Sequence, residues 1–476
     1  MSENFEVELL IRALRGRSEV YNLIGENETA LEDINRALLL AHKNGINRSE
    51  AGCFLQLSEI YASISKYKEM KDSAWKAFCI FKKARDNKGA SGSLNNIGYV
   101  YGILGEYPKA IEYFHKSAKL QKKIGDHEGY AVSLDNIGAV YSRAGDYQKS
   151  LEYHNRALKI FKKIGNRVDE AICLNNIGYV YDMLGEFVKA LKYYNKYRSL
   201  SEKTGILESQ ATSLNNIAGV YRKLCDYPRA LEYYTRSLKI REKIGDRYYQ
   251  ALCLNNIGLV YIMLGNYPEA LRFFGESLKL RKEINDRLGE VESLCSVATV
   301  HIVHGRFNAA ETALRAAEKI VSKVKINSVS AALYVTFGEL ELKRYLGRHR
   351  GAKKQKKFLH HLNKARQYSR MALKFTDKAG VSLQRAEALL LAARVGIMEQ
   401  KRRAVERFRE SLKVFEAMKI PTGVADAYYK YAEVLYNTSE PDARKESRRY
   451  FEKAMSIYKK VKLFKRIEEL KKQFAK

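Results

Sequence analysis

The sequence lacks three features that would assign it to a common functional class. It has no apolar run long enough to span a membrane, and its first residues do not resemble a signal peptide. It has six cysteines, but no two of them form the CxxC pair that is typical of redox and zinc motifs. We therefore expect reduced thiols, no cofactor and a cytoplasmic protein.

Recognisable catalytic and metal-binding motifs are absent as well. The segment GRHRGAKKQKK at 347–357 lacks the hydroxyl residue and the preceding strand of a phosphate-binding loop. There is no HExxH motif, and the nine histidines are scattered. His360 and His361 are adjacent, so on a helix they would point about 100° apart and would not share a metal. The sequence predicts a protein that is not an enzyme and holds no metal.

What the sequence does contain is a repeat of 40 residues. The string LNNIGYVY occurs at 94–101 and again at 174–181, and LNNIGLVY occurs at 254–261. Counted in steps of 40 from Ile11, the same features return without an insertion as far as residue 330, which gives eight blocks. One position of the block holds tyrosine seven times and histidine once, at Tyr21, Tyr61, Tyr101, Tyr141, Tyr181, Tyr221, Tyr261 and His301.

Each block divides into two predicted helices. Leu94, Ile97 and Tyr101 have the spacing of one apolar helix face. That helix should end at Gly105, because glycine adopts the left-handed conformation of a helix C-terminus without steric cost. A second helix should begin near Pro108, since a proline in the first turn loses no hydrogen bond. One such hairpin cannot bury its apolar face alone, so the blocks are predicted to stack into an all-α solenoid.

The string LNNIGYVYGILGEYPKAIEYFHKS at 94–117 resembles the tetratricopeptide repeat. The resemblance is to the 40-residue form found in kinesin light chains, Leu-Gly-Asn polarity adaptors and bacterial signalling proteins, and it is strong over residues 11–330 and weaker over 331–460. It implies a right-handed superhelix, a non-catalytic scaffold, and first helices that line a concave groove. Small residues such as Gly98, which should face Ala110, would let the two helices of a hairpin approach closely.

The predicted organisation has four parts. Residues 1–10 are an N-terminal extension, residues 11–330 hold eight regular repeats, and residues 331–457 hold three irregular ones. Residues 458–476 are expected to form a basic helix that caps the last repeat. In the ninth repeat, features of the second helix arrive 15 residues late, so an insertion is predicted near 346–360. The total is about eleven helical hairpins and a capping helix.

Positive charge is concentrated at the C-terminal end of the chain. The formal net charge is +31, and residues 331–476 contain 36 Lys and Arg against 16 Asp and Glu. The densest basic stretch, residues 343–357, contains no acid. A solvated loop is one interpretation, and a patch for nucleic acid, anionic lipid or an acidic protein is the other. Aromatic residues are sparse there, which disfavours sequence-specific recognition of single strands. The candidate polyanion-binding residues are Arg348, Arg350, Lys353, Lys354, Lys356 and Lys357.

The repeated asparagine pairs are the main candidate binding site. An asparagine inside a helix costs up to about 0.7 kcal/mol relative to alanine, so the repeated pairs need a compensating role. A helical wheel places them outside the core face. By resemblance this face is the groove wall, where amides can pair with the backbone of an extended peptide. The candidate peptide-binding residues are Asn95, Asn96, Tyr99, Asn136, Arg143, Asn175, Asn176, Tyr179, Met183, Asn215, Asn216, Lys223, Asn255, Asn256 and Met263.

A second interpretation of the asparagines is structural. One member of each pair would then bond to the backbone of the neighbouring repeat and set the stacking of the repeats. The first interpretation predicts a protein or peptide ligand, with acidic ligands slightly favoured by Arg143, Arg222 and Lys223. The alternative function is a binder of nucleic acid or ribonucleoprotein through the basic C-terminal third. Neither interpretation involves insertion into a membrane.

Overall fold

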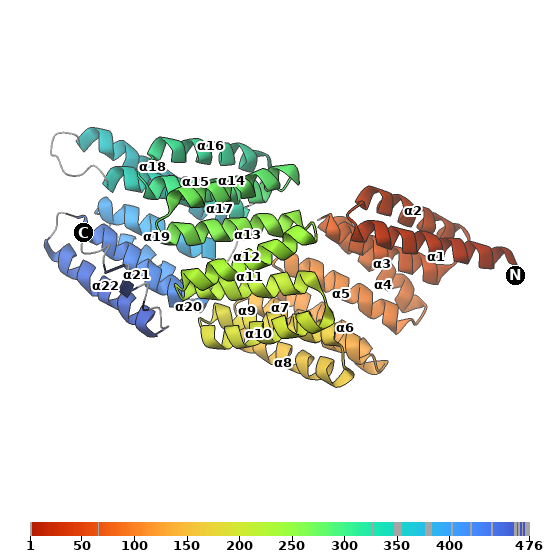
Figure 1. The fold of residues 1–476 in the computed structure, drawn as a ribbon. Helices are drawn as coiled ribbons and strands as arrows, with labels where there is room; N and C mark the ends of the chain where they lie inside the picture. Colours follow the sequence, from red (N-terminus) through yellow and green to blue (C-terminus); the bar gives the residue numbers. More distant parts are fainter. Residues whose placement is uncertain are drawn as a thin grey trace. The chain divides into compact units, whose positions relative to one another are not determined.

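The computed structural model describes residues 2–64, 66–324, 327–346, 355–376, 383–400, 403–418, 421–438, 441–460, 464, 467, 468, 470 and 471. Over these residues the chain forms helices joined by short turns, and no strand is present (Figure 1). The helices are α1 (Ser2–Leu23), α2 (Asn27–Lys43), α3 (Asn47–Ser63), α4 (Tyr67–Lys83), α5 (Asn87–Ile103), α6 (Tyr107–Lys123), α7 (His127–Arg143), α8 (Tyr147–Ile164), α9 (Arg167–Met183), α10 (Phe187–Thr204), α11 (Leu207–Lys223), α12 (Tyr227–Lys243), α13 (Arg247–Met263), α14 (Tyr267–Glu283), α15 (Arg287–Val303), α16 (Phe307–Val324), α17 (Asn327–Leu346), α18 (Gln355–Thr376), α19 (Leu383–Met398), α20 (Arg403–Ala417), α21 (Pro421–Tyr436) and α22 (Pro441–Lys460).

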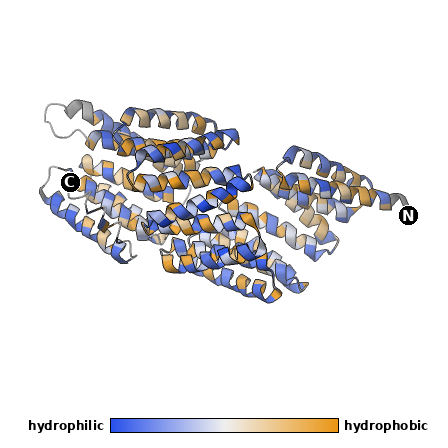
Figure 2. Ribbon diagram, in the orientation of Figure 1, coloured by the Kyte–Doolittle hydropathy of each residue, from blue (hydrophilic) through white to orange (hydrophobic). Residues whose placement is uncertain are grey.

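Odd-numbered and even-numbered helices are the first and second helices of successive hairpins. The all-α solenoid predicted from the repeat is confirmed, and in the described part of the chain the helices make eleven hairpins. The chain divides into two compact units, Met1–Val180 and Tyr181–Lys476. The first unit contains α1 to α8 and most of α9, and the second contains α10 to α22. Apolar and polar residues both occur along each helix, as expected for amphipathic helices (Figure 2).

The turns inside the hairpins have the predicted glycine chemistry. Gly105 has a φ of +77°, in the left-handed region, and the N–H of Glu106 donates to the carbonyl of Tyr101 at 2.9 Å. This closure of the last helical turn is the one expected for a glycine C-terminal motif. Cys225, which replaces the glycine in its repeat, adopts the same conformation with a φ of +58°. The backbone requirement therefore persists where the glycine is missing.

Close approach of the two helices in a hairpin depends on a glycine of the first helix. A Cβ atom built on Gly98 would lie 3.0 Å from the ring of Phe114, which is buried. The expected close contact at a small residue is therefore present. The prediction that Gly98 faces Ala110 is wrong, however, because the atoms nearest to Gly98 belong to Phe114. Ala110 instead lies near Gly102, at 3.9 Å. The correction arises because Phe114, one turn further along α6, reaches back to cover Gly98.

The recurring tyrosine has a partner twelve residues later. The rings of Tyr101 and Tyr113 stack with centroids 5.4 Å apart, and Tyr261 stacks in the same way on Phe273 at 5.4 Å. Equivalent stacked pairs are Tyr141 with Tyr153, Tyr181 with Tyr193, and Tyr221 with Tyr233. At His301 the residue twelve positions later is Ala313, so no ring is available there. The first two blocks lack this ring as well, because Asp33 and Ser73 follow Tyr21 and Tyr61 by twelve residues, so the stacked pair belongs to the five central blocks.

The C-terminal part differs from the predicted boundaries. Helix α22 runs to Lys460, so Tyr458 lies inside it and does not begin a separate capping helix. Leu470, one of the few described residues beyond α22, is buried in an apolar cluster with Tyr458 and with Phe187 and Ile217 of α10 and α11. Part of the predicted insertion near 346–360 is helical, because α18 already begins at Gln355, and residues 347–354 lie outside the described residues. The described C-terminal residues therefore share a core with the start of their unit.

Gly258 and Gly275 provide a test of the close helix contact. A Cβ atom on Gly258 would lie 2.7 Å from the fully buried ring of Phe274, whereas one on Gly275 would meet nothing within 4 Å. We expect Gly258→Ala to lower the free energy of unfolding by about 1–3 kcal/mol through overpacking. Gly275→Ala should raise it by up to about 1 kcal/mol, because alanine is the better helix former. Thermal melts followed by circular dichroism measure both, and equal shifts in the same direction would contradict the account.

Candidate peptide-binding face

The candidate binding residues lie on one side of the first helices α5, α7, α9, α11 and α13. We call this side, in each unit taken by itself, the first-helix face and define it by the asparagine pairs, Ile172 and the residues three to seven positions after each pair. Its most exposed apolar side chains are Tyr99, Tyr179 and Met263, with exposed fractions of 45%, 48% and 38%. Arg143 is also exposed, while Met183 and Lys223 are half-buried. The wheel prediction that this side is not core-facing is thus met for Tyr99, Tyr179, Arg143 and Met263.

The asparagine side chains are half-buried, and several of them form hydrogen bonds within the protein. All nine predicted members are half-buried, at Asn95, Asn96, Asn136, Asn175, Asn176, Asn215, Asn216, Asn255 and Asn256. Asn176 Nδ2 donates to Asp135 Oδ2 at 2.9 Å, and Asn256 Nδ2 donates to Asn215 Oδ1 at 3.2 Å. In both cases the partner lies 41 residues earlier, on the first helix of the preceding repeat. These amides therefore link consecutive repeats.

Two further bonds follow the same direction along the stack. Asn96 Nδ2 donates to Ser58 Oγ at 2.7 Å, and Ser133 Oγ donates to Asn95 Oδ1 at 3.0 Å. This is the arrangement that the structural interpretation predicted, with one difference. The partners are side chains of the neighbouring repeat, where the prediction was its backbone. The reason is that side chains 41 or 38 positions apart bridge neighbouring first helices, whose backbone amides are already used within the helices.

A few polar atoms on this face keep unused hydrogen-bonding capacity. Among the described residues, Asp182 Oδ1, Arg222 Nε and Asn255 Oδ1 are buried and have no protein partner. Lys223 Nζ lies 2.6 Å from Asp182 Oδ2, so the predicted ligand-binding charge of Lys223 is already paired. Buried polar atoms without a protein partner are candidates for water or ligand contacts. They belong to the second unit, Tyr181–Lys476.

Sequence reasoning missed one exposed apolar residue of this face. Ile172 on α9 is 43% exposed and precedes Asn176 by one helical turn. With Tyr179, which follows Asn176 by three residues, it places apolar surface on both sides of the amide. The signal was present in the sequence as the i, i+4, i+7 spacing of these three residues. It was overlooked because the equivalent position varies between blocks, with Gly92, Val132, Thr212 and Leu252.

The first helices of the last three hairpins are joined by charged side chains. Arg394 on α19 is almost fully buried between Glu339 on α17 and Glu433 on α21, with ion pairs of 2.5 and 3.3 Å. Burial would raise the pKa of Glu339, but Arg394, Lys430 and Lys343 outweigh it and lower that pKa. Removing one partner of such a buried group leaves an uncompensated charge. This network therefore holds α17, α19 and α21 together.

Two residues of the predicted basic stretch already form ion pairs within the protein. Lys343 pairs with Glu433 at 2.8 Å, and Arg344 pairs with Glu341 at 2.7 Å and with Glu311 at 2.9 Å. The acids that pair with this stretch thus come from an earlier turn of α17 and from α16 and α21. Of the candidate polyanion-binding residues, Arg348, Arg350, Lys353 and Lys354 lie outside the described residues. Lys356 and Lys357 belong to helix α18, so the loop interpretation is wrong for them.

A basic cleft occurs instead among α18, α19 and α20. It has a volume of about 350 Å³ and is lined by Arg366, Arg370, Arg403 and Arg407, with Ser369 at its wall. Arg366 is paired with Glu399 at 3.3 Å, the one acid that lines the cleft. Arg370 and Arg403 are exposed. The residues of this cleft were not predicted, because they come from three helices that are well separated in the sequence.

One buried group brings a cysteine close to a histidine. Cys173, His154 and Asp135 have side-chain ligand atoms within 4.8 Å of one another. Burial, and to a lesser degree the Asp135 carboxylate, raises the pKa of the Cys173 thiol well above its ordinary value. A nucleophilic cysteine needs the opposite shift and access for a substrate. The thiol and the imidazole are both almost fully buried, so this group does not favour an active site.

The fold and the first-helix face together define a class of protein, the α-solenoid built from stacked helical hairpins. Residues 90–163, 140–203 and 209–283 match the family described as tetratricopeptide repeat. Residues 90–203 and 209–283 thus consist of tetratricopeptide repeats, as the sequence resemblance predicted. No curated protein matches it in sequence. No described helix is both long enough and apolar enough to cross a membrane.

Several solved structures are similar to the chain. The apo form of the quorum sensor NprR from B. thuringiensis has a TM-score of 0.46 and 15% identity, and the match covers 86% of this chain and 99% of that one. BtubC from P. vanneervenii has a TM-score of 0.42 and 19% identity, over 46% of this chain and 92% of that one. A putative kinesin light chain from Podospora anserina has a TM-score of 0.37 and 16% identity, over 42% and 98%. None of these similarities indicates which ligand the chain binds.

Asn176 and Asn155 separate the two interpretations of the asparagines. Asn176 bonds across repeats, whereas Asn155 on α8 is exposed and donates to the carbonyl of Leu151 in its own helix. Removing a bond to a carboxylate that is largely buried should outweigh the gain in helix propensity, so we expect Asn176→Ala to destabilise the protein by about 1 kcal/mol. Asn155→Ala should be neutral or slightly stabilising. Melting temperatures without ligand measure this, and an unchanged melt for Asn176→Ala would refute the linking role.

Proposed function

We propose that this protein is a non-catalytic scaffold that binds an extended peptide or a segment of a partner protein along its first-helix face. Stacked tetratricopeptide hairpins form a protein-binding scaffold in general. The finer proposal concerns where the ligand lies and which side chains contact it. It differs from the simple asparagine-ladder hypothesis, because several amides already link the repeats.

The observation that carries the proposal is the exposed apolar surface beside the amides. In the unit Met1–Val180, Tyr99 on α5 and Tyr179 on α9 are close to half exposed, and Ile172 adds a third apolar side chain. Tyrosine combines a large apolar ring with a hydroxyl group and loses little conformational entropy on binding, so it is enriched among residues that dominate binding energy. The amide links between repeats then hold these anchors in place.

Peptide selection tests this proposal. A displayed random-peptide library is selected on the full chain, and the affinity of the best peptide is measured for variants. We expect Tyr99→Ser and Tyr179→Ser each to weaken binding at least about tenfold, the loss of one interface anchor. Tyr248→Ser is the matched control, since Tyr248 is 49% exposed but lies at the start of α13. If the three variants lost the same amount of peptide affinity, or if none lost any, the proposal that the peptide binds on the first-helix face would be rejected.

A second candidate function follows from the basic cleft. Two arginines from α18 and two from α20 converge on one cavity, with a single acid among its lining residues. Arginine forms charge-assisted bonds with phosphate oxygens. Together with the positive excess of residues 331–476, this favours a polyanion such as a single-stranded RNA at the cleft. The peptide site and the polyanion site would then occupy different parts of one scaffold.

Salt dependence tests the second function. Binding of a 20-nucleotide RNA is titrated at several salt concentrations for the wild type and for the triple variant Arg370→Ala, Arg403→Ala, Arg407→Ala. We expect the slope of log K against log salt to fall by about 2, because each lost phosphate contact removes about 0.7 for single strands. The control removes three exposed lysines of the other unit, Lys122, Lys123 and Lys163. If the lysine control lost as much RNA affinity as the triple arginine variant, RNA binding would depend on the net charge of the protein and not on the cleft.

A further inference from the structure

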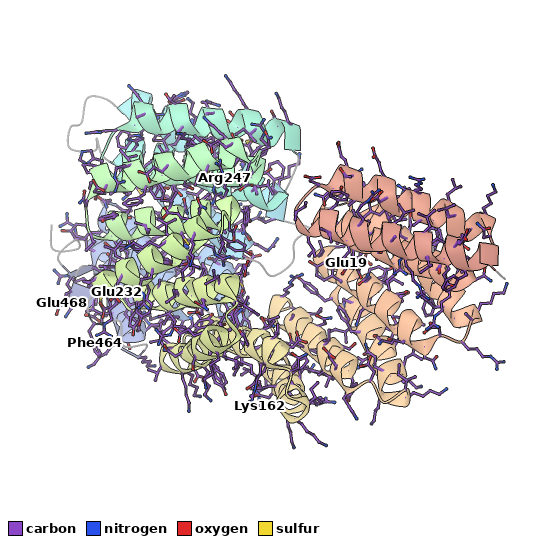
Figure 3. The ribbon with its side chains drawn as sticks, turned by 45° about the vertical axis from the view of Figure 1, so that its right-hand side comes forward. Glu19, Lys162, Glu232, Arg247, Phe464 and Glu468 are labelled. Carbon is purple, nitrogen blue, oxygen red and sulfur yellow. The ribbon has the colours of Figure 1, made fainter. Side chains whose placement is uncertain are left out.

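Three side chains with metal-ligating atoms meet between three consecutive helices of the unit Met1–Val180. Asp135 lies on α7, His154 on α8 and Cys173 on α9, and their ligand atoms are all within 4.8 Å of one another. In Figure 3, Lys162 marks the C-terminal end of α8, the helix that carries His154. The three residues are separated by 19 positions in each interval. No short sequence motif has that spacing, so the group is visible only in the folded chain.

The repeat shows that this combination is specific to one place in the chain. The position of Asp135 holds asparagine in the flanking blocks, at Asn95, Asn175, Asn215 and Asn255. The position of His154 holds an aromatic residue, at Phe114, Tyr194, Tyr234 and Phe274. The position of Cys173 holds serine or cysteine, at Ser93, Ser133, Ser213, Cys253 and Ser293. Only between α7 and α9 do a carboxylate, an imidazole and a thiol replace them together.

The surrounding structure holds the three ligands in place. The side chain of His154 is 1% exposed and that of Asp135 14%, and Cys173 is fully buried. The imidazole lies against Gly138, where a Cβ atom would be 2.8 Å from Nδ1 and Cε1. The Cys173 thiol donates to the carbonyl of His154 at 3.0 Å. The site therefore has fixed walls and needs no large rearrangement of the backbone.

Asp135 is oriented from both sides. Its Oδ1 lies 2.6 Å from His154 Nδ1, and its Oδ2 accepts from Asn176 Nδ2 at 2.9 Å. A carboxylate that ligates a metal is usually held by such an outer hydrogen bond. Two more acids, Glu128 and Asp169, lie close by and are bridged by the amide of Asn166 at 2.9 and 2.8 Å. The neighbourhood is thus rich in negative charge.

We propose that Asp135, His154 and Cys173 bind a divalent transition-metal cation of the zinc type, with Asn176 orienting the carboxylate. Oxygen, nitrogen and thiolate ligands are the set that Zn²⁺ takes in proteins. To bind the cation through Nδ1, the neutral imidazole carries its proton on Nε2, and the thiol releases its proton to solvent. Ligands about 2.0–2.1 Å from zinc in a tetrahedron lie about 3.3 Å apart, so Nδ1 and Oδ1 must separate slightly from their present distance.

The proposed role of the cation is structural. Bound to one residue from each of α7, α8 and α9, it joins the two helices of one hairpin to the first helix of the next. The polar links between first helices described above, such as that of Asn96 to Ser58, are single hydrogen bonds. Three protein ligands leave a fourth position for water, but the burial of the group leaves no room for a substrate. Metal binding should therefore raise stability without adding catalysis.

Cobalt titration of the full chain is the test. After treatment with a chelator, Co²⁺ is added and the visible and near-ultraviolet spectra are recorded. We expect one Co²⁺ per chain, with visible bands of a tetrahedral site and a near-ultraviolet band from a thiolate ligand. Zn²⁺ should displace the cobalt and raise the melting temperature. A wild-type chain that shows neither band would overturn the proposal and leave the three residues as a hydrogen-bonded polar core.

Variants that restore the residues of the other repeats identify the ligands. Cys173→Ser should abolish the near-ultraviolet band, and His154→Phe and Asp135→Asn should each weaken Zn²⁺ binding at least 100-fold, with helicity checked by circular dichroism. Asn176→Ala should weaken it about tenfold, as for an outer-shell partner. Cys253→Ser is the matched control, because Cys253 has the same repeat position but faces Asn215. A thiolate band that survives Cys173→Ser, or is lost in Cys253→Ser, would assign the metal to another thiol.

Discussion

The close contact between the two helices of each hairpin is the constraint on which the rest of this structure depends. Where the first helix carries Gly98, Gly138 or Gly258, a ring of the second helix fills the space that a Cβ atom would need. The hairpin is thereby thin enough to stack on the next one, and the apolar face that it cannot bury alone is covered by its neighbour. Substitutions at these glycines therefore act on the whole stack and not only on one turn.

The same stacking decides what the polar residues can do. First helices of adjacent repeats lie close enough for side chains one position out of register to bond, as in Asn176 to Asp135 and Asn256 to Asn215. The helix propensity lost at these asparagines is thus offset inside the protein. What remains for a ligand is the exposed surface beside them. In the first unit this surface is Tyr99, Ile172 and Tyr179.

Much of the fold could be predicted because it is local and repeated. Periodic apolar residues, cap glycines such as Gly105 and the fixed 40-residue phase predict the hairpins and their number. The site was harder, because it depends on which atoms meet across repeats. Whether Asn176 contacts solvent or Asp135 cannot be read from a helical wheel. Neither could the burial of Arg394 between two glutamates, nor the meeting of Asp135, His154 and Cys173 from three helices, since these contacts join residues far apart in sequence.

Hydrogen–deuterium exchange of the full chain, with and without a selected peptide, tests the central claim most directly. Bound peptide should slow exchange in the first helices, with the largest effect around Tyr99 on α5 and Tyr179 on α9, because ligand contacts and reduced local opening both protect amides there. The second helices α6 and α8 should change little. Protection confined to those second helices, or to α18, α19 and α20, would contradict binding on the first-helix face.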